Sequence, residues 1–146
     1  MRKSLIILGI LDDGDLEWLI ENGSGRQLQE GDVLLRQGHK VEAMYFLLDG
    51  SLSVELESPK AKRLAELESG EVIGEISLLD SRNATASVRA LDEALLLEIR
   101  HEKLKPKLEA DLGFQARLYR SLGMFLAQRM RSTILTLSYG DDRSEE

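Results

Sequence analysis

The sequence predicts one domain that is mainly β and carries helices at both ends. The chain of 146 residues is about one domain long, and its 42% hydrophobic and 31% charged residues are ordinary for a globular protein. Between residues 26 and 100, short apolar runs recur at roughly ten-residue spacing and are separated by turn residues. Before and after this region, apolar residues recur every three or four positions, as they do in amphipathic helices.

Residues 1–25 are expected to form one or two short helices. Apolar side chains occupy residues 5–11 and 16–20, with Gly14 between the two groups and Asp15 as an acidic cap. Turn residues at 22–25 then end the helical part. The basic N-terminus and its first apolar run loosely resemble a signal peptide, but no small-residue cleavage site follows, which favours an amphipathic helix.

Seven apolar runs are expected to be strands. They cover residues 33–35, 43–48, 52–56, 64–67, 72–73, 87–91 and 95–99. Turn residues such as Asp49 and Gly50 separate these runs, which favours a compact antiparallel sandwich or barrel. Residues 58–62 are expected to be an exposed hairpin tip, because Pro59 cannot donate a hydrogen bond to a central ladder.

Two helices are expected after the last strand. Residues 101–110 form a charged first helix containing Pro106, and Asp111 caps a second helix. The apolar stripe of the second helix consists of Tyr119, Leu122, Leu126, Met130, Ile134 and Leu137, widened by Leu118 and Phe125. The basic residues on this helix, expected to form a solvated face, are Arg117, Arg120, Arg129 and Arg131.

The length of this second helix predicts a homodimer through residues 111–137. At about 1.5 Å per residue the helix is about 40 Å long, more than one small barrel covers. The alternative is that the helix folds back and buries the whole stripe within its own subunit. Residues 138–146 are polar and acidic and are expected to fray, although Tyr139 is a candidate lid over a bound ligand.

Composition excludes several classes of function. A net charge of −7 argues against a general nucleic-acid surface. The absence of cysteine excludes disulfides and thiol catalysis and fits the reducing cytoplasm. No apolar stretch is long enough to span a membrane.

The two histidines, His39 and His101, lie far apart in the sequence without a matched nucleophile, so no enzyme is expected. The acidic cluster that is expected to be solvated rather than to hold a metal is Glu66, Glu68, Glu71 and Glu75.

Residues 74–90, GEISLLDSRNATASVRA, are the stretch whose composition best suits ligand binding. A glycine and a carboxylate open it, and small or hydroxylated residues, Thr85 among them, precede an apolar strand. Small residues allow the backbone to approach a ligand, and free N–H groups at the start of a short helix attract an anion. The alternative is a strand, one helical turn and a strand that bind nothing.

Four motifs in this order resemble the cyclic nucleotide-binding domain family. They are Gly31-Asp32-Val33-Leu34 with Gly38, Met44-Tyr45-Phe46 leading to Gly50, Gly74-Glu75-Ile76-Ser77-Leu78-Leu79, and Ala86-Ser87-Val88-Arg89-Ala90. The resemblance covers roughly residues 5–137 and is closest to bacterial catabolite-activator-like sensor domains. It implies an eight-stranded β-roll, a jelly-roll-like barrel, with a phosphate-binding cassette at residues 74–90. It also implies that the long C-terminal helix pairs subunits and closes over the ligand.

The resemblance also implies roles for individual residues toward cAMP or cGMP, with no other cofactor. Glu75 would accept a hydrogen bond from the ribose 2′-hydroxyl, and Gly74 would let the sugar approach. The backbone N–H groups of Ile76 and Ser77 would meet the phosphate, with Ser87 close to the ligand. The strand positions expected to line the base pocket are Leu52, Val54, Leu64 and Leu67.

One departure from the family pattern affects the phosphate. Ala84 occupies the position where the family usually has its phosphate-binding arginine. Losing a charge-assisted hydrogen bond worth about 1.5–3 kcal/mol is expected to weaken binding by roughly ten- to a hundredfold. Arg82 could reach back to replace it; the alternative is a surface residue that pairs with Asp80.

Three functions follow as hypotheses. The first is a sensor that binds a cyclic nucleotide and signals through its C-terminal helix to a protein partner. The second is a degenerate form of the same fold that serves as an interaction or dimerisation module without nucleotide affinity. The third is a transcription factor, but only about nine residues follow Leu137, so no direct DNA binding is expected.

Overall fold

The computed structural model describes residues 9–145, apart from the side chains of Ile76 and of residues 138–145. Residues 5–8 of the first expected helix lie outside this range, and Gly9 and Ile10 are helical. The elements in chain order are α2 (Asp13–Asn22), β1 (Ser24–Leu28), β2 (Val33–Leu35), β3 (Ala43–Asp49), β4 (Ser51–Leu56), β5 (Lys62–Glu68), β6 (Val72–Ile73), α3 (Glu75–Asp80), β7 (Ser87–Ala90), β8 (Ala94–Arg100), α4 (His101–Ala110) and α5 (Leu112–Glu145).

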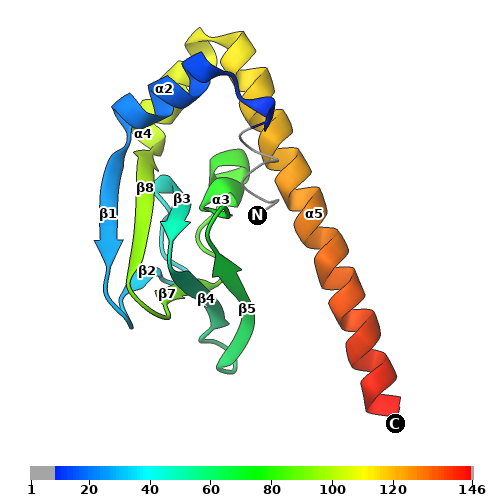
Figure 1. Ribbon diagram of the computed structural model, residues 1–146. Helices are drawn as coiled ribbons and strands as arrows, with labels where there is room; N and C mark the ends of the chain where they lie inside the picture. The colour runs from blue at the N-terminus through cyan, green and yellow to red at the C-terminus, as the bar shows by residue number, and fades with distance from the viewer. Residues whose placement is uncertain (1–8, 146) are drawn as a thin grey trace.

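The strands form two four-stranded antiparallel sheets, in the orders β1-β8-β3-β6 and β2-β7-β4-β5 (Figure 1). The register pairs Tyr45 with Glu98 in the first sheet and Val54 with Val88 in the second. All seven predicted strands are present, and the expected β-roll with helices at both ends is confirmed. The hairpin tip predicted at residues 58–62 lies between β4 and β5, with residues 57–61 exposed.

The prediction omitted β1. Its sequence SGRQL buries only Leu28, so it carries no alternating apolar pattern. It becomes a strand because it pairs along its whole length with β8, from Ser24 opposite Glu98 to Leu28 opposite Ala94. Pairing with a distant strand, rather than the local sequence pattern, therefore makes this segment a strand.

Apolar side chains form two clusters, one on each face of the first sheet. The cluster between the sheets includes Leu52, Leu96 and Tyr45, and the cluster beneath the helices includes Met44 and Phe114. Strand β3 thus sends alternate side chains into different clusters, which explains its continuous apolar run.

The start of α2 differs from its prediction. Asp12 is the N-cap: its Oδ1 accepts from Asp15 N at 2.8 Å, and Asp15 Oδ2 accepts from Asp12 N at 3.0 Å. This is a capping box, in which Asp15 is the reciprocal partner. The predicted break at Gly14 is wrong, because Gly14 lies inside α2.

The long helix α5 begins as predicted and ends later. Asp111 Oδ1 accepts from Phe114 N at 3.0 Å and so caps its first turn. The helix continues to Glu145, so the expected frayed tail at residues 138–146 is wrong for residues 138–145. That segment contains no proline, and its polar residues do not block helix formation.

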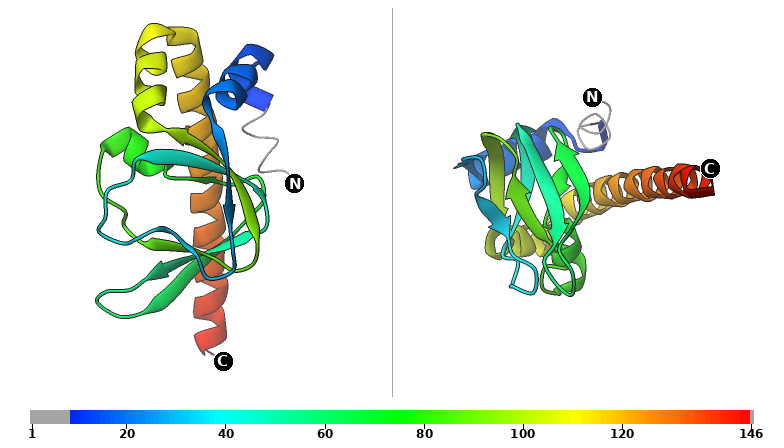
Figure 2. Two further views of the ribbon diagram at one scale, coloured as in Figure 1. Left: turned by 90° about the vertical axis from the view of Figure 1, so that its left-hand side faces the viewer. Right: turned by 90° about the horizontal axis from the view of Figure 1, so that it is seen from below.

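Helix α5 buries its apolar side chains against its own domain mainly in its N-terminal half. Leu118, Leu122 and Phe125 are fully buried there, whereas Met130 and Ile134 further along are 67% and 56% exposed. The right-hand view of Figure 2 shows the C-terminal half projecting to one side of the β-roll. The alternative that the whole stripe is buried within one subunit is therefore wrong for this second half.

Candidate functional site

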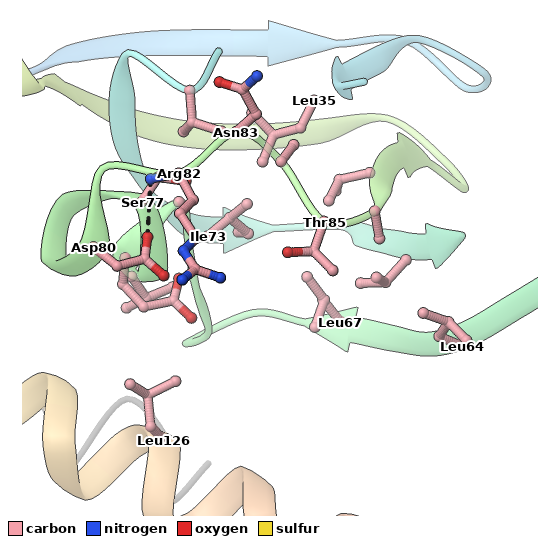
Figure 3. Close-up of a pocket in the computed structure, with 18 of the residues that line it drawn as sticks. Leu35, Leu64, Leu67, Ile73, Ser77, Asp80, Arg82, Asn83, Thr85 and Leu126 are labelled. Atoms are coloured by element: carbon pink, nitrogen blue, oxygen red, sulfur yellow. Dashed lines mark hydrogen bonds between the residues drawn. The ribbon is translucent and has the colours of Figure 1, made fainter. Parts of the chain in front are cut away.

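A cavity of about 320 Å³ lies between the second sheet, α3 and α5 (Figure 3). Its aliphatic lining consists of Leu35, Val41, Val54, Leu64, Leu67, Val72, Ile73, Val88 and Leu126. Its polar and charged lining residues come from α3, the α3–β7 loop and α5. A largely apolar cavity of this size with a few convergent polar groups is typical of a small-ligand site.

Gly74 allows the backbone to turn sharply into α3 beside this cavity. Its φ of 86° lies in the left-handed region, and an added Cβ would collide with the carbonyl oxygen of Ala43. The first bond of the helix runs from Leu78 N to Gly74 O at 3.4 Å. The N–H groups of Glu75, Ile76 and Ser77 precede this bond, at the end of the helix that attracts negative charge.

Glu75 is a carboxylic acid held out of water. Its side chain lines the cavity and is only 6% exposed. Burial raises the pKa of Glu75 to about 7, and the Glu71 carboxylate adds to the rise; a backbone hydrogen bond and the Arg129 guanidinium oppose it. Glu75 can therefore accept or donate a hydrogen bond close to neutral pH.

Arg129 connects α5 to this acidic end. Its Nη1 lies 3.3 Å from Oε1 of Glu71. The Glu71 residue is only 2% exposed, and its other carboxylate oxygen, Oε2, accepts a hydrogen bond from Glu68 N at 2.8 Å. Arg129 also lines the cavity and packs its guanidinium over the Phe125 ring. Expecting Arg129 in a solvated face was therefore wrong, because helical periodicity gives no sign of a partner such as Glu71, which lies in the distant β5–β6 turn.

The loop after α3 is pinned to the β2–β3 loop. Ala84 N donates to His39 O at 2.9 Å, Gly38 N donates to Ala84 O at 2.8 Å, and Asn83 Nδ2 donates to Gly38 O at 3.0 Å. These bonds fix the backbone on both sides of Ala84, whose methyl group lines the cavity.

Arg82 is the basic residue of this loop that lines the cavity. Its backbone N–H, rather than its guanidinium, bonds to Asp80 Oδ1 at 3.0 Å. Among the side chains that the structure describes, those of residues 9–137 without Ile76, no carboxylate forms an ion pair with the Arg82 guanidinium, so the alternative charge pairing with Asp80 is not present. Figure 3 shows the Arg82 side chain entering the cavity on its α3 side, beside Asp80, with Thr85 further across.

Residues 25–111 match the family described as the cyclic nucleotide-binding domain. The chain belongs to the cyclic nucleotide-binding domain family. The predicted family and fold class are therefore confirmed.

Related proteins agree with this membership. The chain is 28% identical over 109 residues to the cAMP-activated global transcriptional regulator CRP of Salmonella typhimurium, covering 73% of this chain and 52% of that protein. It resembles the N-terminal domain of a transcriptional regulator from Streptomyces coelicolor A3(2), with a TM-score of 0.72 and 31% identity over 88% of this chain and 90% of that one. A cyclic nucleotide-binding domain from Methylobacillus flagellatus gives a TM-score of 0.79 at 18% identity, over 90% and 80% of the two chains, and so supports the fold alone. The chain spans about half the length of the Salmonella regulator.

The structure places most of the predicted cassette residues at the cavity. Gly74, Glu75, Ser77, Arg82, Ala84 and Thr85 line it. Ser87 does not, because it is fully buried and its Oγ accepts from Gln37 N at 2.9 Å. The side chains of Ile76 and Tyr139 lie outside the described part of the chain.

Three of the four residues predicted to line the base pocket lie at the cavity, and one does not. Val54, Leu64 and Leu67 line the cavity, whereas Leu52 is fully buried in the cluster between the sheets. Sequence reasoning missed the two α5 residues that line it, Leu126 and Arg129.

Among the described side chains of residues 9–137, no three His, Asp or Glu groups lie closely enough together to hold a metal ion. In the same range, no helix combines the length and apolar character that crossing a membrane requires.

Proposed function

We propose that the chain is a regulatory module that binds a cyclic nucleotide in the 320 Å³ cavity and transmits binding through α5. The observation that carries this proposal is that the cassette and α5 line the same cavity, through Glu75 and Arg82 on one side and Leu126 and Arg129 on the other. A ligand there contacts both elements, so its binding energy can depend on the position of α5.

Each part of a cyclic nucleotide has a chemical counterpart in this cavity. The aliphatic strand residues suit the base, and the buried Glu75 suits a ribose hydroxyl. The first turn of α3 and the Arg82 guanidinium suit the cyclic phosphate. Because Ala84 contributes no charge, Arg82 is the phosphate ligand in this proposal.

Ligand binding would act on α5 through Glu75 and Arg129. A hydroxyl that donates to Glu75 stabilises its ionised form, which adds negative charge near Arg129. The attraction between α5 and the cassette then increases. The shift in the position of α5 is limited by the difference in ligand affinity between its two arrangements.

A second candidate function rests on Ala84 alone. Without a charged group at this position the chain would serve as an interaction or dimerisation module that keeps the fold and lacks nucleotide affinity. The two candidates differ in whether Arg82 replaces the missing charge.

Titration calorimetry with cAMP and cGMP at low ionic strength tests the proposal, using wild-type protein, Ala84→Arg and Arg82→Gln. We expect saturable binding by the wild type, a loss of about tenfold or more in Arg82→Gln, and a gain of roughly ten- to a hundredfold in Ala84→Arg. Ala61→Arg, in the exposed β4–β5 hairpin tip, is the matched control and should leave binding unchanged.

The outcomes separate the candidates. Binding by Ala84→Arg together with no heat from the wild type would favour the degenerate module. An absence of binding by both proteins would overturn the assignment of the cavity to a cyclic nucleotide.

A further inference from the structure

The antiparallel ladder between β4 and β7 ends where the chain turns toward the cavity. Its last pair is Glu55 opposite Ser87. If the two strands continued in this register, residues 57–58 would lie opposite residues 84–85, but residues 84–85 leave the sheet and line the cavity instead. The backbone groups on both sides of the gap therefore need other partners, because unpaired backbone groups are costly.

Gln37, two residues after the end of β2, supplies these partners on the β4 side of the gap. Its Oε1 accepts from Glu57 N at 2.7 Å and from Ser58 N at 3.2 Å, and its Nε2 donates to Ser58 O at 2.9 Å. The two accepted bonds fix the orientation of the amide, since only its oxygen can accept. On the other side of the gap, the next two residues of the loop bond both backbone groups of Ala84. Three consecutive residues of the β2–β3 loop thus replace the missing part of the ladder.

The bonds of Gln37 hold a wall of the cavity that β4 and β5 provide. The cavity residues on these strands are Val54, Leu64 and Leu67, and Figure 3 shows the last two along β5. In its sheet β5 is the edge strand beside β4, so the position of this wall depends on what holds the hairpin. Glu57 also forms ion pairs with Arg36 and Arg89, at 3.7 and 3.9 Å, but partly exposed pairs of this length contribute little. The three hydrogen bonds of Gln37 are the better-defined tie.

We propose that Gln37 is a positioning residue for the base of the nucleotide, because its amide holds the β4–β5 hairpin so that the aliphatic side chains of the hairpin face the ligand. This inference rests on the proposed function, in which these side chains contact the base. The apparent affinity for the base then falls with the fraction of molecules in which the hairpin is held. The groups assigned to ribose and phosphate, Glu75 and Arg82, lie on the cassette and do not depend on the Gln37 amide.

Titration calorimetry of the wild type and Gln37→Met tests this inference with two ligands, cAMP and methyl riboside cyclic phosphate, in which a methoxy group replaces the base. Methionine has about the length of glutamine and removes its three side-chain hydrogen bonds, while the backbone N–H still donates to Ser87 Oγ. We expect the affinity of Gln37→Met for cAMP to fall about tenfold and its affinity for the base-less compound to stay within about twofold of the wild type. A purely structural role would weaken both.

Gln27→Met is the matched control, because Gln27 is exposed on β1 and lies outside the cavity. It should bind both compounds as the wild type does. Hydrogen exchange followed by mass spectrometry needs no ligand, and residues 56–62 should exchange faster in Gln37→Met than in the wild type or Gln27→Met. If the wild type binds neither compound, the proposed function fails, and the exchange result alone decides whether Gln37 holds the hairpin. Equal weakening of both compounds, or unchanged exchange in Gln37→Met, would overturn the inference.

Discussion

At the scale of single residues, Glu75 has the most consequential electrostatics. Its pKa of about 7 in the folded protein lies above the ordinary value of 4.5. The folded protein therefore holds a proton that the unfolded chain releases between these pH values. The resulting stability is fully present below pH 4.5 and is lost as the pH rises through about 7.

Glu75→Gln should remove this pH dependence. The difference between 4.5 and about 7 corresponds to about 3 kcal/mol. We expect the variant to match the wild type near pH 4.5 and to exceed its free energy of unfolding by about 3 kcal/mol at pH 8, as measured by urea denaturation. Glu66→Gln, exposed on β5, is the control and should change stability by less than about 0.5 kcal/mol at both pH values. An equal stability difference at both pH values would contradict a buried, proton-holding Glu75.

The sequence could predict the cassette side of the cavity but not the α5 side. Gly74, Glu75 and Ala84 belong to one short stretch whose spacing matches a family motif, so their proximity follows from local order. Arg129 and Leu126 reach the same cavity only because α5 packs across the β-roll. Ser87 occupies a cassette position, yet a hydrogen bond to Gln37 N turns it away from the cavity, and no pattern in the sequence reports that bond.

At the scale of elements, an ion pair with a buried carboxylate joins α2 to the start of α5. The guanidinium of Arg117 on α5 donates from Nε and Nη2 to the two carboxylate oxygens of Asp15 on α2, at 2.6 and 2.9 Å. Asp15 is 4% exposed, and its hydrogen bond with Arg117 is the main cause of its lowered pKa. Arg117 therefore fixes the N-terminal helix against α5 and does not belong to a solvated face.

Asp15→Asn should separate this role from simple helix capping. Losing the charge weakens both bonds to Arg117, and we expect the free energy of unfolding to fall by about 2 kcal/mol at pH 7. Asp13→Asn, exposed in the first turn of the same helix, should change it by less than about 0.5 kcal/mol. Equal destabilisation by both substitutions would mean that only helix charge matters.

Elements with strong local patterns could be predicted, and those set by distant partners could not. The seven apolar runs and the bounds of α4 follow from their own residues. In contrast, β1 depends on β8, and α2 begins at a capping box in which the predicted cap, Asp15, is the reciprocal partner. The end of α5 at Glu145 exceeded the prediction because polar composition alone does not end a helix.

At the scale of the whole molecule, α5 presents an apolar seam that its own domain leaves exposed. Tyr119, Met130, Ile134 and Leu137 are 40%, 67%, 56% and 62% exposed. With the small residues Gly123 and Ala127 between them, they recur at spacings of three and four, as in a two-stranded coiled coil. The helix is about 50 Å long, so a second copy can pair along it beyond the β-roll.

This seam predicts a homodimer that single substitutions can break. Sedimentation velocity should give a dimer for the wild type and a monomer for Ile134→Glu, because a charge at the seam cannot be buried without a partner. Leu135→Glu is the matched control: Leu135 is 58% exposed on the same helix, but one residue further along it faces about 100° away from the seam. The control should remain dimeric. A monomeric wild type at micromolar concentration, or dissociation by both substitutions alike, would mean that the exposed half of α5 contacts a different partner.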